Sequence, residues 1–300
     1  MSLIEMIGCV IYLYIFSKVN HEGNAPVLCS TFSADGNVVF TGGADKAVRM
    51  WQLGQQPPNG VPQQIGAHND SVKSIGFIPS TSLVVSGGWD GCLKFWDGKQ
   101  SNPVHQVQLT DKVYDLDVKG NVLIVACANR VLYVFDVSGQ PRQVDRMESP
   151  LKLQTRCVSV FPDQTGFAVG SIEGRVGLKH VGNNLSTKDF NFKCHRKDTS
   201  TVFSVNAIPF HNGFGTFATV GGDGVINFWD KENRSRLKFF AAKGETIPCA
   251  TFNQPGNIFA YACSYDWSKG ATHYNPSTAK NEIRLYVVKE EDIRPKQKKR

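Results

Sequence analysis

The chain lacks the short motifs that carry most catalytic chemistry. Its 300 residues contain no Walker A loop, no GxGxxG after an expected strand, no HExxH and no GxSxG. The eight cysteines include no CxxC pair, which argues against a zinc site or a disulfide framework and favours reduced thiols in an intracellular compartment. We therefore predict no enzyme activity, no metal site and no cofactor.

Long apolar runs are missing as well. The run from Met6 to Phe16 is apolar, but it is too short to span a bilayer, and Glu5 stands where a signal peptide needs a basic residue. We interpret residues 1–19 as an atypical apolar N-terminus, one or two strands left from a repeat unit. The sequence predicts no membrane span.

The excess of positive charge is small outside the C-terminus. The formal net charge is +7, and four of the basic residues lie among the last five positions: Lys296, Lys298, Lys299 and Arg300. The tail 290–300 is polar and contains a proline, so we predict a basic, disordered, solubilising tail, with a nuclear-import or nucleic-acid patch as the alternative. The rest of the chain is only mildly basic, and its charge alone does not indicate a nucleic-acid binder.

What the chain does contain is a repeat. The pattern TGGADKAVRMW at residues 41–51 returns at 86–96, 125–135, 169–179 and 219–229. Each copy has a strand ending in small residues, a tight polar turn and an alternating apolar strand, which predicts a hairpin. The spacing of 39 to 50 residues is typical of one four-stranded blade of a WD-repeat propeller. We therefore predict an all-β WD40 β-propeller of the seven-bladed family, with about six complete repeats within residues 20–289.

The second unit, residues 68–97, is the most regular. Four of its residues occupy the positions of the hydrogen-bonded tetrad that WD blades share: His68, Ser86, Asp90 and Trp96. The alternative, a Ser/His/Asp hydrolase trio, is disfavoured because Ser86 lies in a strand without a nucleophile elbow and Asp90 lies in a hairpin turn. We interpret the four residues as a structural tetrad.

Two local features mark the later units. Residues 189–195 alternate and are expected to form the outer strand of the fourth unit. Cys194 and His195 then point to opposite faces, so we expect a buried cysteine beside a surface histidine rather than a catalytic pair. The sixth unit, 246–288, contains an insertion at 265–281 between its second and third strands.

Basic and aromatic residues cluster in the fourth and fifth units. Between Arg175 and Lys238 there are ten Lys or Arg residues and five Asp or Glu residues. The turns and strand ends that carry them are expected to converge at one rim of the propeller. Such a surface suits an acidic peptide with an apolar anchor, and it equally suits a single-stranded nucleic acid. A solvated face without function is the third interpretation.

Several longer stretches support a family resemblance. Residues 151–181, 190–196 (FNFKCHR), 205–231 and 252–270 resemble the WD-repeat mRNA export factors of the nuclear pore, the RAE/GLE class. The sister class of BUB-type spindle-checkpoint propellers shares EGRV and FKCHR but lacks SYDWSKG, which is present here at residues 264–270. Members of the export class open with a full first repeat, and residues 1–19 stand in its place.

The resemblance implies a function and a set of partners. It implies a non-enzymatic adaptor that binds the GLEBS segment of a GLFG-repeat nucleoporin and supports mRNA export. It further implies a monomer bound to its partner, in the nucleus, at the nuclear envelope and nuclear pore, and also in the cytoplasm. The alternatives are an RNA-binding propeller that takes single-stranded RNA and a mitotic spindle-checkpoint scaffold.

The resemblance also implies the residues that bind the partner. The matching positions are Arg175, Phe192, Lys193, Trp229, Asp230, Lys231 and Arg234. Arg175, Lys193 and Arg234 are expected to pair with carboxylates or phosphates of the partner. Phe192 and Trp229 are expected to pack around an apolar anchor, and Asp230 to orient its basic neighbours.

Overall fold

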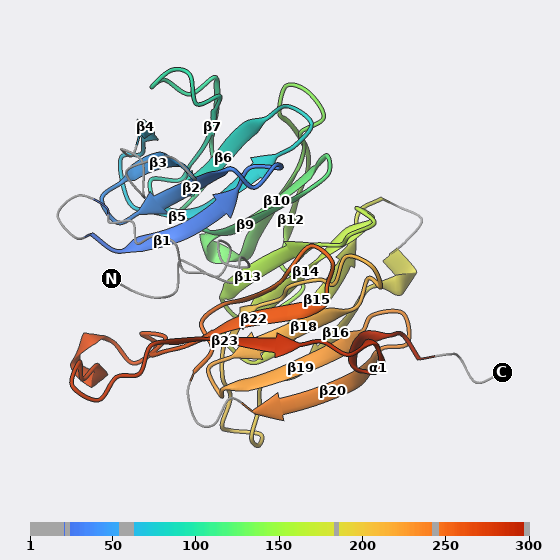
Figure 1. The fold of residues 1–300 in the computed structure, drawn as a ribbon. Coiled ribbons are helices and arrows are strands. Elements are labelled where there is room, and N and C mark those ends of the chain that lie inside the picture. Colours follow the sequence, from blue (N-terminus) through green and yellow to red (C-terminus); the bar gives the residue numbers. More distant parts are fainter. Residues whose placement is uncertain (1–20, 22–24, 54–62, 183–185, 242–245, 297–300) are drawn as a thin grey trace. The chain divides into compact units, whose positions relative to one another are not determined.

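A computed structural model describes most of the chain as two compact units, Met1–Ser149 and Pro150–Arg300 (Figure 1). The described residues are 21, 25–53, 63–182, 186–241 and 246–296. The predicted apolar N-terminus, residues 1–19, lies outside them. Within these ranges, no helix is long and apolar enough to cross a bilayer.

The first unit contains three antiparallel four-stranded sheets, each built from strands in chain order. The first sheet is β1 (Val27–Phe32), β2 (Val38–Gly43), β3 (Ala47–Gln52) and β4 (Gln63–Ala67). The second is β5 (Val72–Ile78), β6 (Leu83–Gly88), β7 (Cys92–Trp96) and β8 (His105–Gln108). The third is β9 (Val113–Lys119), β10 (Val122–Cys127), β11 (Val131–Asp136) and β12 (Arg142–Glu148), with a 3-10 turn, η3 (Ala128–Arg130), before β11.

The second unit contains two four-stranded sheets and one three-stranded sheet. The fourth sheet is β13 (Thr155–Val160), β14 (Gly166–Ser171), β15 (Arg175–His180) and β16 (Phe190–Lys193), with η4 (Ser186–Lys188) before β16. The fifth is β17 (Val205–Ala207), β18 (Phe217–Gly221), β19 (Val225–Asp230) and β20 (Ser235–Ala241). The sixth is β21 (Ala250–Phe252), β22 (Ile258–Cys263) and β23 (Glu282–Val287), with η5 (Ala271–His273) in the insertion and α1 (Glu290–Ile293) after β23.

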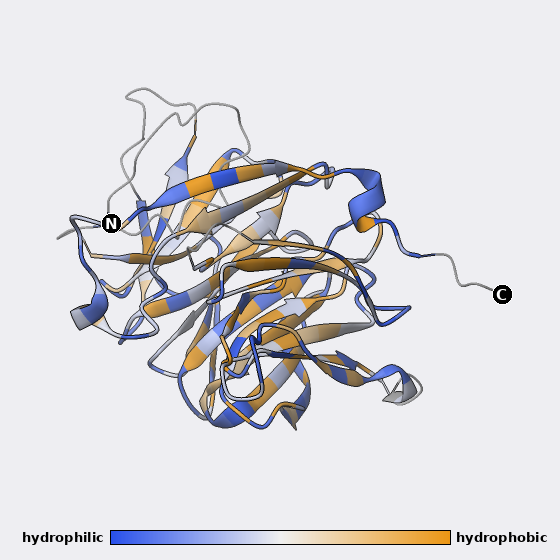
Figure 2. Cartoon of the chain, turned by 90° about the horizontal axis from the view of Figure 1, so that it is seen from below, coloured by the Kyte–Doolittle hydropathy of each residue, from blue (hydrophilic) through white to orange (hydrophobic). Residues whose placement is uncertain are grey.

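Burial falls from the second strand of a sheet to its outer strand. All six residues of β14 are buried, whereas β12 is exposed at six of its seven positions. The second strand carries small and branched apolar residues because side chains pack on both of its faces. The outer strands β8 and β16 instead alternate between half-buried and exposed residues. Figure 2 shows hydrophobic and hydrophilic residues interspersed along the strands. The strand pattern of the sequence therefore reflects position within a sheet.

The hairpin turns before the third strands require unusual backbone conformations. Gly174 has a φ of +64°, and a Cβ there would lie 2.3 Å from the carbonyl oxygen of His195, so only glycine fits. In the third sheet this turn is made by Asn129 and Arg130, both with positive φ. That replacement explains why the third unit is a weak copy of the repeat.

The repeat organisation agrees with the sequence in most respects. Six sheets lie within the described residues, not the seven of the family expectation, and the sixth has three strands there. The outer strand predicted at 189–195 is confirmed, because β16 pairs with β15 in register from Lys193 opposite Arg175. The insertion lies between β22 and β23, as predicted.

The prediction of a disordered C-terminal tail was wrong as far as Lys296. Residues 290–293 form α1, and Ile293 is 1% exposed within the core shared by the fifth and sixth sheets. The prediction failed because a polar composition describes the exposed residues of this segment but not the single isoleucine that anchors it. Residues 297–300 lie outside the described ranges.

Candidate partner-binding surface

A complete chain of buried hydrogen bonds joins four residues at the second sheet. The Nδ1–H of His68 donates to Asp90 Oδ1 at 3.0 Å, Ser86 Oγ donates to His68 Nε2 at 2.8 Å, and Trp96 Nε1 donates to Ser86 Oγ at 2.8 Å. Burial lowers the pKa of His68, although the bond to Asp90 opposes that shift. Burial acts to raise the pKa of Asp90, but donors including the Asn69 amide outweigh it, so this pKa is lowered. The neutral histidine thus bridges a carboxylate and a hydroxyl as a structural linker.

Two further sheets have the same hydrogen-bond chain, which sequence analysis missed. The residues are His21, Asp45, Thr41 and Trp51 at the first sheet, and His195, Asp223, Thr219 and Trp229 at the fifth. His195 is 0% exposed, so the expectation of a surface histidine was wrong. A signal was available, because each histidine precedes its aspartate by 22 to 28 positions.

The thiol of Cys194, beside His195, is a poor nucleophile. Burial raises the pKa of Cys194 to about 12, so its thiolate is scarce at neutral pH. His195 is occupied by Asp223 and Thr219. Among the described residues, no group of three or more His, Cys, Asp or Glu side chains is arranged to hold a metal ion.

The tryptophan of the fifth sheet differs from those of the other two hydrogen-bond chains because it reaches the surface. Trp229 is partly exposed, and its ring centroid lies 4.6 Å from that of Phe192 on β16. Phe192 and Phe190 alternate with the exposed Asn191 and Lys193 along the strand and pack partly into the core between the fourth and fifth sheets. An aromatic pair therefore lies in the middle of this surface, which we call the β16 surface: β16 with Trp229, Arg175, Lys188 and Arg234.

One end of the β16 surface is formed by a cation–aromatic contact. The guanidinium carbon of Arg234 lies 4.6 Å from the centre of the Phe190 ring, and Nη2 donates to the Lys188 carbonyl at 3.5 Å. Both basic residues are exposed. They border a hollow of about 200 Å³ whose lining also includes Leu178 and His180. Neither Lys188 nor Phe190 was predicted as a site residue.

The other end carries a second basic cluster. Arg175 and Lys193 are direct partners across β15 and β16. Glu173 Oε2 lies 3.3 Å from Arg175 Nε and 3.5 Å from Arg196 Nη2, so this carboxylate holds two guanidinium groups side by side. Arg196 was not singled out in the sequence, because its proximity depends on the bend of the chain after β16.

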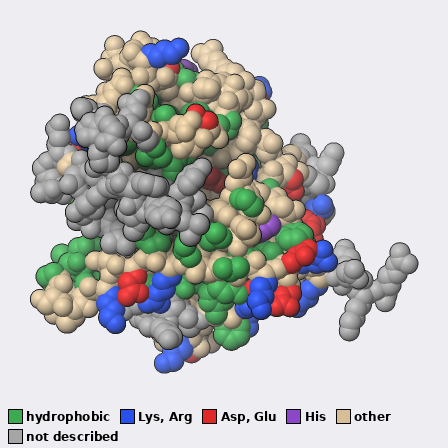
Figure 3. Space-filling model, in the orientation of Figure 1, with side chains coloured by type: hydrophobic (Ala, Val, Ile, Leu, Met, Phe, Trp, Pro, Cys, Tyr) green, Lys and Arg blue, Asp and Glu red, His purple; other side chains and the backbone are tan. Residues whose placement is uncertain are grey.

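The basic groups of the β16 surface lie at two places along the strand. Lys193 and Phe190 are three positions apart on an extended strand, which separates the two ends by about 10 Å. On the face of the second unit that is in view, Figure 3 shows basic and acidic side chains interspersed. The predicted residues therefore lie along a strand, with aromatic rings between two basic ends.

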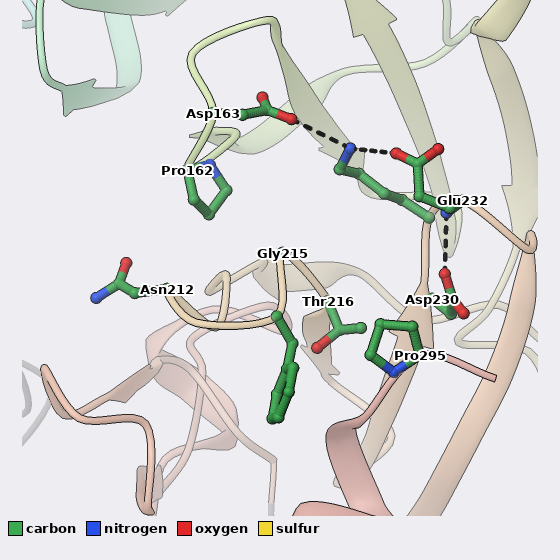
Figure 4. Close-up of a pocket in the computed structure, with 10 residues that line it drawn as sticks. Pro162, Asp163, Asn212, Gly215, Thr216, Asp230, Glu232 and Pro295 are labelled. Carbon is green, nitrogen blue, oxygen red and sulfur yellow. Dashed lines mark hydrogen bonds and ion pairs between the residues drawn. The ribbon is translucent and has the colours of Figure 1, made fainter. Parts of the chain in front are cut away.

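Two predicted residues, Asp230 and Lys231, line a neighbouring pocket, and Lys231 also lines the hollow beside Arg234. Asp230 is 2% exposed and accepts hydrogen bonds from the amides of Glu232 and Asn233. The Lys231 side chain is 10% exposed, with Nζ 2.6 Å from Glu232 Oε1 and 3.4 Å from Asp163 Oδ2. These residues line a pocket of about 410 Å³ (Figure 4). Lys231 is thus an internally paired charge.

Comparison with known proteins agrees with the repeat pattern. Residues 14–52 and 60–97 match the family described as WD domain, G-beta repeat. Protein RAE1 of Arabidopsis thaliana is 46% identical over 280 residues, covering 93% of this chain and 78% of the relative. The Poly(A)+ RNA export protein of Schizosaccharomyces pombe is 39% identical over 289 residues, covering 94% and 80%. The mRNA export factor of Danio rerio is 43% identical over 295 residues, covering 94% and 78%. The chain therefore belongs to the RAE1/GLE2 family of WD-repeat β-propeller mRNA export factors.

Proposed function

We propose that this protein is a non-enzymatic adaptor in mRNA export that docks an acidic segment with an apolar anchor on the β16 surface. The partner of this chemistry is a GLEBS-type segment of a GLFG-repeat nucleoporin. The observation that carries the proposal is the partly exposed Phe192–Trp229 pair between two basic ends. The names of the relatives support the role in export.

The arrangement suits an acidic partner for electrostatic and packing reasons. Lys193 and Arg234 are exposed, so both charges are accessible to a carboxylate and can form charge-assisted hydrogen bonds with it. The aromatic pair offers a rigid apolar contact area, the usual source of binding energy at an interface. Two carboxylates about 10 Å apart on the partner would match the separation of the two basic ends. We further propose that the protein acts as a monomer on its partner, at the nuclear pore and in the nucleus and cytoplasm.

The decisive experiment is calorimetric titration with a GLEBS-type acidic peptide. The double variant Lys193→Glu/Arg234→Glu should lower the affinity by about 100-fold or more, because each reversed charge removes a charge-assisted contact of about 1.5–3 kcal/mol. The matched control is Lys269→Glu/Lys280→Glu, which changes the net charge equally at two exposed positions in the insertion between β22 and β23. Equal affinities for the two variants would reject the site.

A second candidate function is favoured by the contact between Arg234 and Phe190. A cation stacked on a partly buried ring, beside the exposed Lys188, is the arrangement that single-stranded nucleic acids use for base stacking and phosphate pairing. We infer that RNA would compete with the acidic peptide for the same end of β16. A steep loss of RNA affinity with salt, abolished in Lys193→Glu/Arg234→Glu, would establish this function.

A further inference from the structure

We propose that the C-terminal strap, residues Lys289–Lys296, is a positioning element that fixes the turn Asp230–Arg234 and with it the basic end of the β16 surface. The strap lies more than 50 positions after this turn in the sequence. The effect of the strap on partner binding rests on the proposed function, whereas its effect on the conformation of the turn is independent of that function.

The strap is anchored in the core of the second unit. Ile293 packs in the same apolar cluster as Phe228 and Phe259, from β19 and β22. Its carbonyl oxygen accepts a hydrogen bond from Thr216 Oγ1 at 2.9 Å, across 77 positions of sequence. An anchor this deeply buried is a fixed point, so residues a few positions beyond it have little freedom.

A charged contact holds the strap on its other side. Lys238 Nζ on β20 lies 2.7 Å from Asp292 Oδ1, and Tyr286 OH on β23 donates to Asp292 Oδ2 at 2.6 Å. The bond to Asp292 is the largest influence that raises the pKa of Lys238. The strap therefore joins the outer strand of the fifth sheet to the last strand of the sixth.

Beyond this anchor the strap binds the turn directly. The Lys296 amide donates to Asp230 Oδ2 at 3.2 Å, and Asn233 Nδ2 donates to the Lys296 carbonyl at 2.8 Å. Asn233 Nδ2 also donates to Asp230 Oδ2 at 2.6 Å, so the three residues form a closed hydrogen-bond ring. Pro295 stands beside Asp230 and Thr216 in the wall of the pocket (Figure 4).

The turn needs such support because of its backbone. Arg234 has a φ of +50°, in the left-handed region that favours glycine. Its guanidinium nevertheless reaches Phe190 on β16. A strained backbone persists only where its surroundings hold it, and the ring through Lys296 lies one residue away. The strap thus stabilises the conformation in which Arg234 faces β16.

Three shortened chains of two lengths test the proposal: residues 1–296, residues 1–296 with Lys296→Ala, and residues 1–295. The first two keep the backbone groups that bind Asp230 and Asn233 and differ only in a side-chain charge. The third loses those groups and keeps the Ile293 anchor. Peptide affinity, thermal stability and hydrogen exchange of the Glu232 and Asn233 amides are measured for each.

We expect 1–295 to bind the acidic peptide about fivefold or more weakly than both 1–296 chains, a size typical of coupling between distant groups. Its Glu232 and Asn233 amides should exchange faster, with an unchanged melting temperature. In the full chain, Asp292→Asn should shift exchange in the same direction while the turn sequence stays intact. Equal exchange rates in 1–295 and 1–296 would overturn the proposal.

The two proposals fail separately. If no chain binds the peptide, the proposed function is rejected, and the exchange rates alone decide the role of the strap. Faster exchange in 1–295 then supports the positioning role. If 1–295 binds and exchanges like 1–296, the strap is a packing element without influence on the surface, and the inference is wrong.

Discussion

Trp96 and Trp229 occupy the same position in the second and fifth sheets but have different environments. Each indole nitrogen donates to a hydroxyl, Ser86 at 2.8 Å and Thr219 at 2.9 Å. Trp96 is 1% exposed, whereas Trp229 is partly exposed. The tetrad alone therefore does not determine whether the tryptophan reaches the surface.

The difference in exposure comes from the outer strand that ends just before each histidine, β4 before His68 and β16 before His195. Gly66 lies on β4 two positions before His68, and a Cβ there would be 2.0 Å from the Trp96 ring. The backbone of β4 therefore closes directly over Trp96. In the fourth sheet Phe192 has the matching place in the register, because Val48 pairs with Gly66 and Val176 pairs with Phe192. The Phe192 ring lies beside Trp229. A glycine at this position lets the backbone cover the tryptophan, whereas a phenylalanine forms a partly exposed aromatic pair with it.

The largest expected effect is a difference in stability. Trp96→Ala should lower the free energy of unfolding by about 3–5 kcal/mol, because it removes a fully buried ring. Trp229→Ala should cost clearly less, because part of its ring already contacts water. Chemical denaturation of both variants measures this, and equal costs would remove the proposed distinction.

For binding of the acidic peptide the order of the two tryptophans should be reversed, with Trp229 the more important. Trp229→Ala and Phe192→Ala should each reduce the free energy of binding of the acidic peptide by about 2 kcal/mol or more, the loss typical of an aromatic residue central to an interface. The control is Leu153→Ala, an exposed apolar side chain of the same unit. Calorimetric titration measures the three affinities. If Leu153→Ala lowers the affinity as much as Trp229→Ala does, the peptide responds to general surface hydrophobicity and not to this aromatic pair.

The strand position itself can be tested next. Gly66→Ala should lower stability by about 1–3 kcal/mol, because the added methyl overlaps the Trp96 ring. Lys193→Ala should change stability by less than about 0.5 kcal/mol, as is usual for an exposed side chain, and act on peptide affinity alone. A stable Gly66→Ala protein would mean that Trp96 moves readily and is not confined by β4.

The smallest effect concerns pH. His68 and His21 have lowered pKa values in the folded protein, so the folded state binds protons less readily than the unfolded chain. The free energy of unfolding should therefore decline as the pH falls below the ordinary histidine value of 6.5, down through the lowered folded values. His68→Asn should flatten this decline. The same slope in wild type and variant would show that other groups dominate.

Much of the fold was predictable because its determinants are local. A small-residue strand, a tight turn and an alternating strand follow from a dozen neighbouring residues. The same local logic located the outer strand at 189–195 and the insertion at 265–281. The burial of His195 was not predictable from alternation, because its face is set by Asp223 and Thr219, more than 20 positions away.

The candidate site was predictable in residue type and less so in arrangement. Composition and the family resemblance selected Phe192, Lys193, Trp229 and Arg234, which lie along the β16 surface. They also selected Lys231, which is paired with Asp163 and Glu232. Sequence proximity could not separate these cases, because Asp163 lies 68 positions from Lys231.

The sequence by itself determined the repeat, the strand order within each sheet and the chemistry available to the surface, since these depend on side chains close together along the chain. Only the tertiary structure decided which tryptophan reaches the surface, which lysine is paired and how the C-terminal strap reaches the turn at Asp230. Those outcomes depend on contacts between distant segments. Each segment's own pattern is compatible with several partners, and packing selects among them.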